Sequence, residues 1–180
     1  MSKIETNSIM GVSGEGSSPI TLSGNTATLS GTGVNFPTGH ILQVVNATLS
    51  NVETPETART SETVVANATN QITITSGNKV HIYAQVTLRG IASSNVVLEA
   101  RLREGTDTTG TILSKSNFMN NNTSATFHSP HFLIALDDSP ASTTPSYTLT
   151  MLKGSGGTSS VSLKSDDASF LKIILMEIQA

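Results

Sequence analysis

The stretch that decides the fold is Lys79-Val80-His81-Ile82-Tyr83-Ala84-Gln85-Val86-Thr87-Leu88-Arg89, in which apolar and polar residues alternate without a break. Successive side chains of a β-strand point to opposite faces, so the apolar half of the stretch shares one face. At about 3.3 Å per residue the stretch spans roughly 36 Å, the height of a sandwich domain. It therefore predicts a long strand that buries one of its two faces.

Shorter segments of the same kind lie on both sides of this stretch and are separated by turn residues. Residues 95–103 could also form a short helix with Glu99 and Arg103 paired at i, i+4, but their alternation favours a strand. The predicted strands are residues 41–48, 71–75, 79–89, 95–103, 111–115, 125–136 with a break at Pro130, 147–153, 161–163 and 170–178. Strands at this spacing predict an all-β fold, an antiparallel jelly-roll-like β-sandwich.

The composition supports strands and excludes several classes of protein. The 26 Thr, 25 Ser and 14 Gly, with only 13% charged residues, disfavour a helix bundle or a coiled coil. A net charge of −3 and ten scattered Lys and Arg give no basic surface for nucleic acid. The absence of Cys excludes disulfides and indicates maturation in a reducing compartment. No signal peptide is visible and the longest apolar run is too short to cross a bilayer, so we expect no membrane partner.

The N-terminal part, residues 1–39, differs from the rest of the chain. It contains seven of the 14 Gly, and its apolar residues are too widely spaced to form a core of their own. It could be a disordered tail or an extended Gly/Ser-rich arm that becomes ordered on neighbouring subunits or on a larger assembly. The second interpretation predicts a docking arm at residues 1–39 and a sandwich knob at residues 40–180. The docking residues would be Ile4, Ile9, Val12, Ile20 and Leu22.

The last predicted strand, residues 170–178, is apolar on both faces. Such a strand is either central in the sandwich or has its second face covered by another subunit. We therefore predict a subunit interface at this strand. The residues assigned to it are Leu171, Ile173, Ile174 and Leu175.

Motifs for catalysis, cofactors and metals give no specific signal. There is no nucleophile elbow, dinucleotide-binding glycine motif or P-loop, so we predict that the chain is not an enzyme and has no cofactor. His128 and His131 could form half of a metal site completed across a threefold axis, but we favour a turn with hydrogen-bonding histidines. The acid pairs 137–138 and 166–167 could bind Ca²⁺, but we interpret them as solvated turn residues. No metal ligand is assigned.

A carbohydrate-binding module is the main alternative, because many such modules are β-sandwiches. Sugar-binding platforms usually present exposed aromatic rings, and this chain has five Phe, two Tyr and no Trp. Most of these rings lie in predicted core positions; Tyr83 and Phe118 are the exceptions. Phe118 could contact a ligand from a loop tip, although we favour a ring folded under its own loop.

The order of these segments resembles a class of small virion structural proteins of tailed bacteriophages, of tail-fibre-like or capsid-decoration type and common in marine phages. The resemblance spans nearly the whole chain. It is carried by the Gly/Ser-rich arm and by residues 39–45, 71–80, Arg101 with Arg103, 138–140, 146–149, 169–171 and 176–178.

This resemblance implies a homotrimeric knob on the virion surface, assembled in the bacterial cytoplasm. Its N-terminal arm would dock on other virion proteins, either the major capsid protein or tail proteins, and host surface glycans are a possible further partner. Many phage fibres are much longer than 180 residues, so the size fits a capsid decoration protein or a short docked fibre better. The resemblance brings no catalytic residues to this chain.

Overall fold

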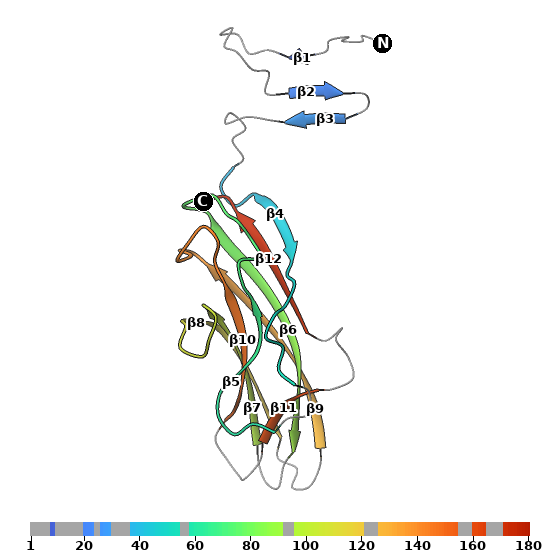
Figure 1. The fold of residues 1–180 in the computed structure, drawn as a ribbon, viewed down its shortest axis with the longest axis vertical. Coiled ribbons are helices and arrows are strands. Elements are labelled where there is room, and N and C mark those ends of the chain that lie inside the picture. Colours follow the sequence, from blue (N-terminus) through green and yellow to red (C-terminus); the bar gives the residue numbers. More distant parts are fainter. Residues whose placement is uncertain are drawn as a thin grey trace. The chain divides into compact units, whose positions relative to one another are not determined.

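A computed structural model describes residues 8–9, 20–23, 26–29, 37–54, 58–91, 96–120, 126–154, 160–164 and 171–180. All regular secondary structure in these ranges is β (Figure 1). The strands are β1 (Ser8–Ile9), β2 (Ile20–Ser23), β3 (Thr26–Leu29), β4 (Ile41–Asn46), β5 (Thr63–Ala68), β6 (Lys79–Ile91), β7 (Val96–Glu104), β8 (Ile112–Asn120), β9 (Thr126–Asp137), β10 (Tyr147–Lys153), β11 (Ser160–Leu163) and β12 (Lys172–Ile178).

Strands β4 to β12 form two antiparallel sheets, which build the predicted sandwich. One sheet has the order β5-β10-β7-β8. In the other, β9 pairs with β6 from Val80 to Ile91, and β12 and β11 pair with successive parts of the opposite edge of β6; β4 pairs with β12. Consecutive strands repeatedly change sheet, as in a jelly-roll-like sandwich. Ala47 continues this pairing beyond β4, because its N–H donates to the carbonyl of Ile173.

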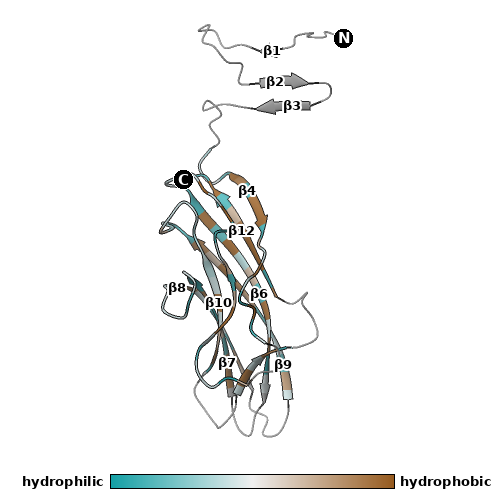
Figure 2. Ribbon diagram, viewed as in Figure 1, coloured by the Kyte–Doolittle hydropathy of each residue, from teal (hydrophilic) through white to brown (hydrophobic). Residues whose placement is uncertain are grey.

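The core lies between the two sheets and follows from the alternation of the opening stretch. The inward residues of β6, from Val80 to Leu88 in steps of two, are fully buried. They pack with inward residues of β7 and β12, such as Leu98, Leu102 and Leu175. Figure 2 shows the resulting bands of opposite hydropathy along β6. The strand interpretation of residues 95–103 is confirmed by β7.

Three details of the predicted strand pattern were wrong. Residues 71–75 form no strand, although Ile72 and Ile74 are buried. Their backbone forms hydrogen bonds with a loop instead of a strand, since the Ile74 N–H donates to the Thr143 carbonyl. The strand β5 was not predicted. The expected break at Pro130 is absent, since β9 runs through it opposite Thr87 of β6. Proline is tolerated where its missing N–H is not needed by a ladder.

The N-terminal residues form a unit of their own, Met1–Pro37, distinct from the unit Thr38–Ala180. Its described residues form a small antiparallel sheet of order β1-β2-β3. In this sheet Ile9 pairs with Ile20, which pairs with Leu29.

Candidate assembly surface

The most unusual surface of the sandwich lies on the outer side of β9. Phe132, Ile134 and Leu136 point away from the core and are 48 to 60% exposed. The residues between them, Leu133 and Ala135, are buried in the core. This strand is therefore apolar on both faces, and one apolar face is open to solvent within a single chain.

The exposed surface continues across three further strands of the same sheet. The strand register places Tyr83 of β6 between Ile134 and Ile174 of β12, and places Val44 of β4, 61% exposed, beside Met176. We call this surface the outer apolar face. Its exposed members are Ile41, Val44, Phe132, Ile134 and Leu136, and its half-buried members are Tyr83, Ile174, Met176 and Ile178.

Charged groups of the outer apolar face lie at its two ends. Lys172 is exposed at one end, beside Gln85 in the register. At the other end the Lys79 ammonium lies 2.8 Å from a carboxylate oxygen of Asp138. Between these two ends, His81 and the phenol of Tyr83 are the ionisable side chains of this face among the described residues. The centre of this face is therefore suited to contact with another apolar surface.

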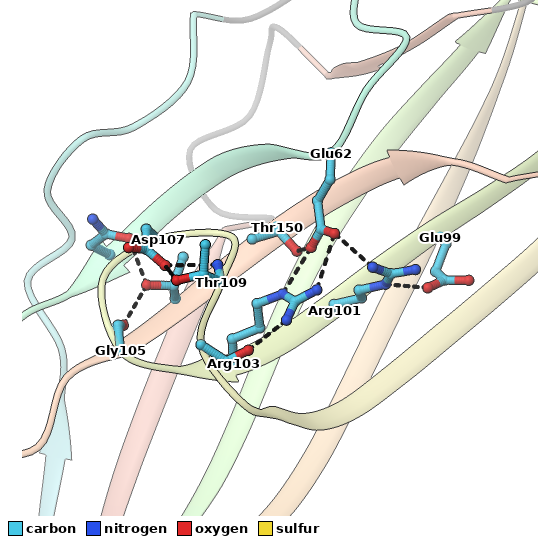
Figure 3. A network of polar contacts seen from close by, with 11 residues as sticks. Glu62, Glu99, Arg101, Arg103, Gly105, Asp107, Thr109 and Thr150 are labelled. Carbon is cyan, nitrogen blue, oxygen red and sulfur yellow. Dashed lines mark hydrogen bonds and ion pairs between the residues drawn. The ribbon is translucent and has the colours of Figure 1, made fainter. Parts of the chain in front are cut away.

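The outer side of the opposite sheet, which we call the polar face, is built differently. Figure 3 shows that the Glu62 carboxylate is held between two guanidinium groups of β7. Its oxygens lie 2.6 Å from Nη1 of Arg101 and 2.8 Å from Nε of Arg103. Thr150 donates its hydroxyl to Glu62 over 2.6 Å, and Arg101 also pairs with Glu99. These charges are largely buried, so each needs its partner.

Ionisation of Glu62 is favoured by this network. Burial by itself would raise the pKa of Glu62, but hydrogen bonds from Arg103 and Thr150 and the charges of Arg101 and Arg103 hold the pKa below its usual value. Arg103 also donates from Nη1 to the Gly110 carbonyl over 2.5 Å. Glu62, Arg101 and Arg103 of the polar face thus satisfy one another's charges.

Three further buried ionisable groups also have structural partners. Glu177 accepts hydrogen bonds from the Thr75 N–H and the side-chain amides of Asn78 and Gln43, which lower its pKa against the opposing effect of burial. Asp137 accepts the Tyr147 hydroxyl over 2.9 Å. Burial lowers the pKa of His131, whose Nδ1 lies 3.2 Å from the Ser116 hydroxyl. These groups fix loops and strands in place.

A polar cleft of about 380 Å³ lies between the loops 74–78 and 138–143. Its side-chain amide and carboxylate are already paired, because Asn78 bonds Glu177 and the Ala180 N–H, and Asp138 pairs with Lys79. No aromatic ring lines it. We therefore do not assign this cleft to a ligand.

The predicted interface residues of the last strand fall on different sides. Ile174 lies on the outer apolar face and Leu171 is half-buried. Ile173 and Leu175 are fully buried in the core, so they cannot contact another subunit. Their placement corrects the prediction, because a strand that is apolar on both faces uses only alternate residues for each face.

Of the predicted docking residues, Ile9 lies in β1, and Ile20 and Leu22 lie in β2. Ile4 and Val12 are outside the described residues. The acid pair 166–167 is outside them as well, and within the other pair Asp137 is buried while Asp138 is exposed.

The two histidines of β9 cannot act together from one chain. The expected turn is a continuous strand, so His128 is exposed on the outer side and His131 is buried on the inner side. Within the described ranges no three His, Cys, Asp or Glu side chains are grouped as metal ligands, and no helix is long and apolar enough to span a membrane.

The two aromatic exceptions of the sequence have ring neighbours. Phe118 lies in β8 rather than in a loop, is 42% exposed, and its ring centroid is 5.8 Å from that of Phe127. The Tyr83 ring lies 6.4 Å from the Phe132 ring, with an interplanar angle of 36°. Tyr83 thus belongs to the outer apolar face.

Sequence reasoning missed the exposed residues of β9 and Val44 of β4. A signal was available for β9, because Phe132-Leu133-Ile134-Ala135-Leu136 is apolar at every position, as is most of the last strand. For Val44 the only signal was its position beside Val45, of which one must face outward.

No protein-family model and no curated protein matches this chain. A solved structure described as "CBM4 structure and function" is similar to it, with a TM-score of 0.26 and 13% sequence identity, over 74% of this chain and 89% of that chain. At this identity and TM-score, the similarity carries no conclusion about what this chain binds.

Proposed function

We propose that this chain is a non-catalytic structural subunit of a bacteriophage virion surface, a β-sandwich knob that works as a homotrimer. The outer apolar face is the observation that carries the proposal. Strands spaced about 4.8 Å apart and rising about 3.3 Å per residue make this face roughly 19 Å by 20 Å, or about 400 Å² in projection. That is about half of what one partner buries in a standard protein interface, so it would form the apolar centre of such an interface.

The virion role is supported by the ordered sequence resemblance, and the docking role by the composition of the N-terminal part. Residues 1–39 contain half of the glycine and few apolar residues, and all but the last two of them belong to a unit, Met1–Pro37, that is separate from the sandwich. A segment that cannot bury a core of its own gains stability when it binds another surface. The arm would therefore attach the knob to capsid or tail proteins.

Sedimentation equilibrium of the purified full chain tests self-association. We expect a trimer at micromolar concentration, and Ile134→Lys should shift the chain towards monomer while its circular dichroism spectrum stays that of a β-protein. Met119→Lys, at a 63% exposed position of β8 outside the face, is the matched control and should leave the trimer intact. A monomeric wild-type chain would refute the homotrimer.

Particle incorporation tests the arm. Deleting residues 2–35 should leave a folded knob, because the unit Thr38–Ala180 contains both sheets of the sandwich. The deletion variant should be absent from purified particles of the phage. Its incorporation at normal copy number would contradict the docking role, whatever its oligomeric state.

Glycan binding is a second candidate, favoured by one observation. The adjacent rings of Tyr83 and Phe132 lie on the outer apolar face, and Phe132 is 54% exposed. Exposed aromatic faces can stack on sugar rings. Binding of the wild-type chain to a glycan array, with loss of binding in Phe132→Ala at an unchanged oligomeric state, would favour this function over the assembly role of the face.

A further inference from the structure

The register of the sheet arranges the outer apolar face in four rows that run across the strands. Each row contains residues that are directly opposite one another in neighbouring strands. The first row is Lys172, Gln85 and Phe132; the second is Asn46, Ile174, Tyr83 and Ile134; the third is Val44, Met176, His81 and Leu136; the fourth is Ile41, Ile178, Lys79 and Asp138.

The middle rows are mostly apolar and would pack on one another in either orientation. The end rows differ in charge, and this difference distinguishes the orientations. The first row combines an ammonium group with an aromatic ring, Lys172 and Phe132. The fourth row combines an ammonium group with a carboxylate, Lys79 and Asp138.

If two copies met with their rows reversed, the first row of one would lie over the fourth row of the other. The Asp138 carboxylate would then approach the face of the Phe132 ring, which carries a negative partial charge. Lys172 would approach Lys79, which has the same charge. With the rows matched, Lys172 can lie over the Phe132 ring of the next copy, a favourable cation–π contact. Lys79 of the next copy lies one strand beyond Ile178 in the same row, so its long side chain can reach Asp138. Charge complementarity therefore favours matched rows.

We propose that a second copy of this chain covers the outer apolar face with its rows matched, so that the β9 side of one copy packs on the β4–β12 side of the next. This inference rests on the proposed homotrimer. A threefold axis parallel to the strands keeps every row at one height and makes each contact between two different surface regions. A twofold axis across the strands would reverse the rows.

Engineered cysteines test this register, and the native chain has no Cys to interfere. Val44 and Leu136 share the third row but lie three strand spacings apart within one chain, about 14 Å. A disulfide requires Cα atoms within about 7 Å, so a bond between these positions must join two copies. Mild oxidation of the V44C/L136C double variant should give a covalent trimer on a non-reducing gel.

The matched control is V44C/F132C, which pairs the third row with the first and should cross-link at least tenfold less. A covalent trimer in V44C/L136C with little product in the control supports the proposal. Preferential cross-linking of V44C/F132C, or no cross-linking of either variant while both sediment as trimers, overturns the register but not the homotrimer. Covalent dimers alone overturn the threefold arrangement. A monomeric wild-type chain overturns both the register and the proposed function.

Discussion

The two outer faces of the sandwich are both built from antiparallel strands, but they differ in how they meet solvent. On the polar face, Arg101 and Arg103 are covered and paired with Glu62, so that side is complete within one chain. On the outer apolar face, Phe132, Ile134 and Val44 are left about half exposed or more. The comparison teaches that one sheet pairs its buried charges within the chain, whereas the other exposes an apolar surface of the kind that marks an interaction site.

Breaking the polar face should have the largest effect on stability. Glu62→Gln leaves two largely buried guanidinium groups without their shared counter-charge, and we expect a loss of about 3 to 5 kcal/mol in the free energy of unfolding. Urea denaturation at one fixed protein concentration measures it. Glu53→Gln is the control, because its partner Arg59 is 39% exposed, and it should cost less than about 1 kcal/mol. Equal losses in both variants would contradict the structural role of the network.

Two neighbouring residues of β12 sharpen the comparison further. Ile173 is fully buried, so Ile173→Ala should lower the free energy of unfolding by about 2 to 4 kcal/mol. Ile174 lies on the outer apolar face, so Ile174→Ala should cost less than about 1 kcal/mol in a monomeric sample but should weaken self-association. Denaturation and sedimentation of both variants separate the two effects. Similar unfolding losses in dilute, monomeric samples would show that Ile174 is not on a free surface.

The alternation of apolar and polar residues made most of the fold predictable, but only where the alternating segment is paired in a sheet. It predicted β6 and β7 because both strands are paired and bury their apolar faces between the two sheets. It misassigned residues 71–75, which form a loop that buries Ile72 and Ile74. Backbone N–H groups of this loop donate to Glu177 and to the Thr143 carbonyl. It overlooked β5, Thr63–Ala68, because Val64-Val65-Ala66 shows no alternation.

The candidate surface was less predictable than the fold. A strand that is apolar on both faces indicates a covered second face, and that reasoning reached Ile174. It could not separate Ile174 from Ile173, because the sequence does not say which parity faces the core. The surface also depends on β4, β12, β6 and β9 lying side by side, a strand order that short-range patterns do not contain. The Glu62 network likewise joins residues about forty positions apart in the chain.

The polar face should also give the protein its sensitivity to acid. The pKa of Glu62 is lowered in the folded state, so its contribution to stability is present above its unfolded pKa of about 4.3 and is lost as the pH falls below that value. Melting temperatures of the wild-type chain should therefore fall between about pH 5 and pH 3. Glu62→Gln, although less stable throughout, should show a shallower fall. An unchanged pH profile in this variant would assign the acid sensitivity to other carboxylates.

The smallest expected effect on stability concerns the ion pair at the end of the outer apolar face. The side chains of Lys79 and Asp138 are 37% and 65% exposed, and such pairs contribute little because water and salt screen them. Asp138→Asn should therefore change the free energy of unfolding by less than about 0.5 kcal/mol. Its effect on self-association should be larger than this, because the same carboxylate would be partly desolvated beside the next copy. If urea denaturation of dilute monomer and sedimentation gave equally small changes, Asp138 would lie outside the contact, and the outer apolar face would end at its third row.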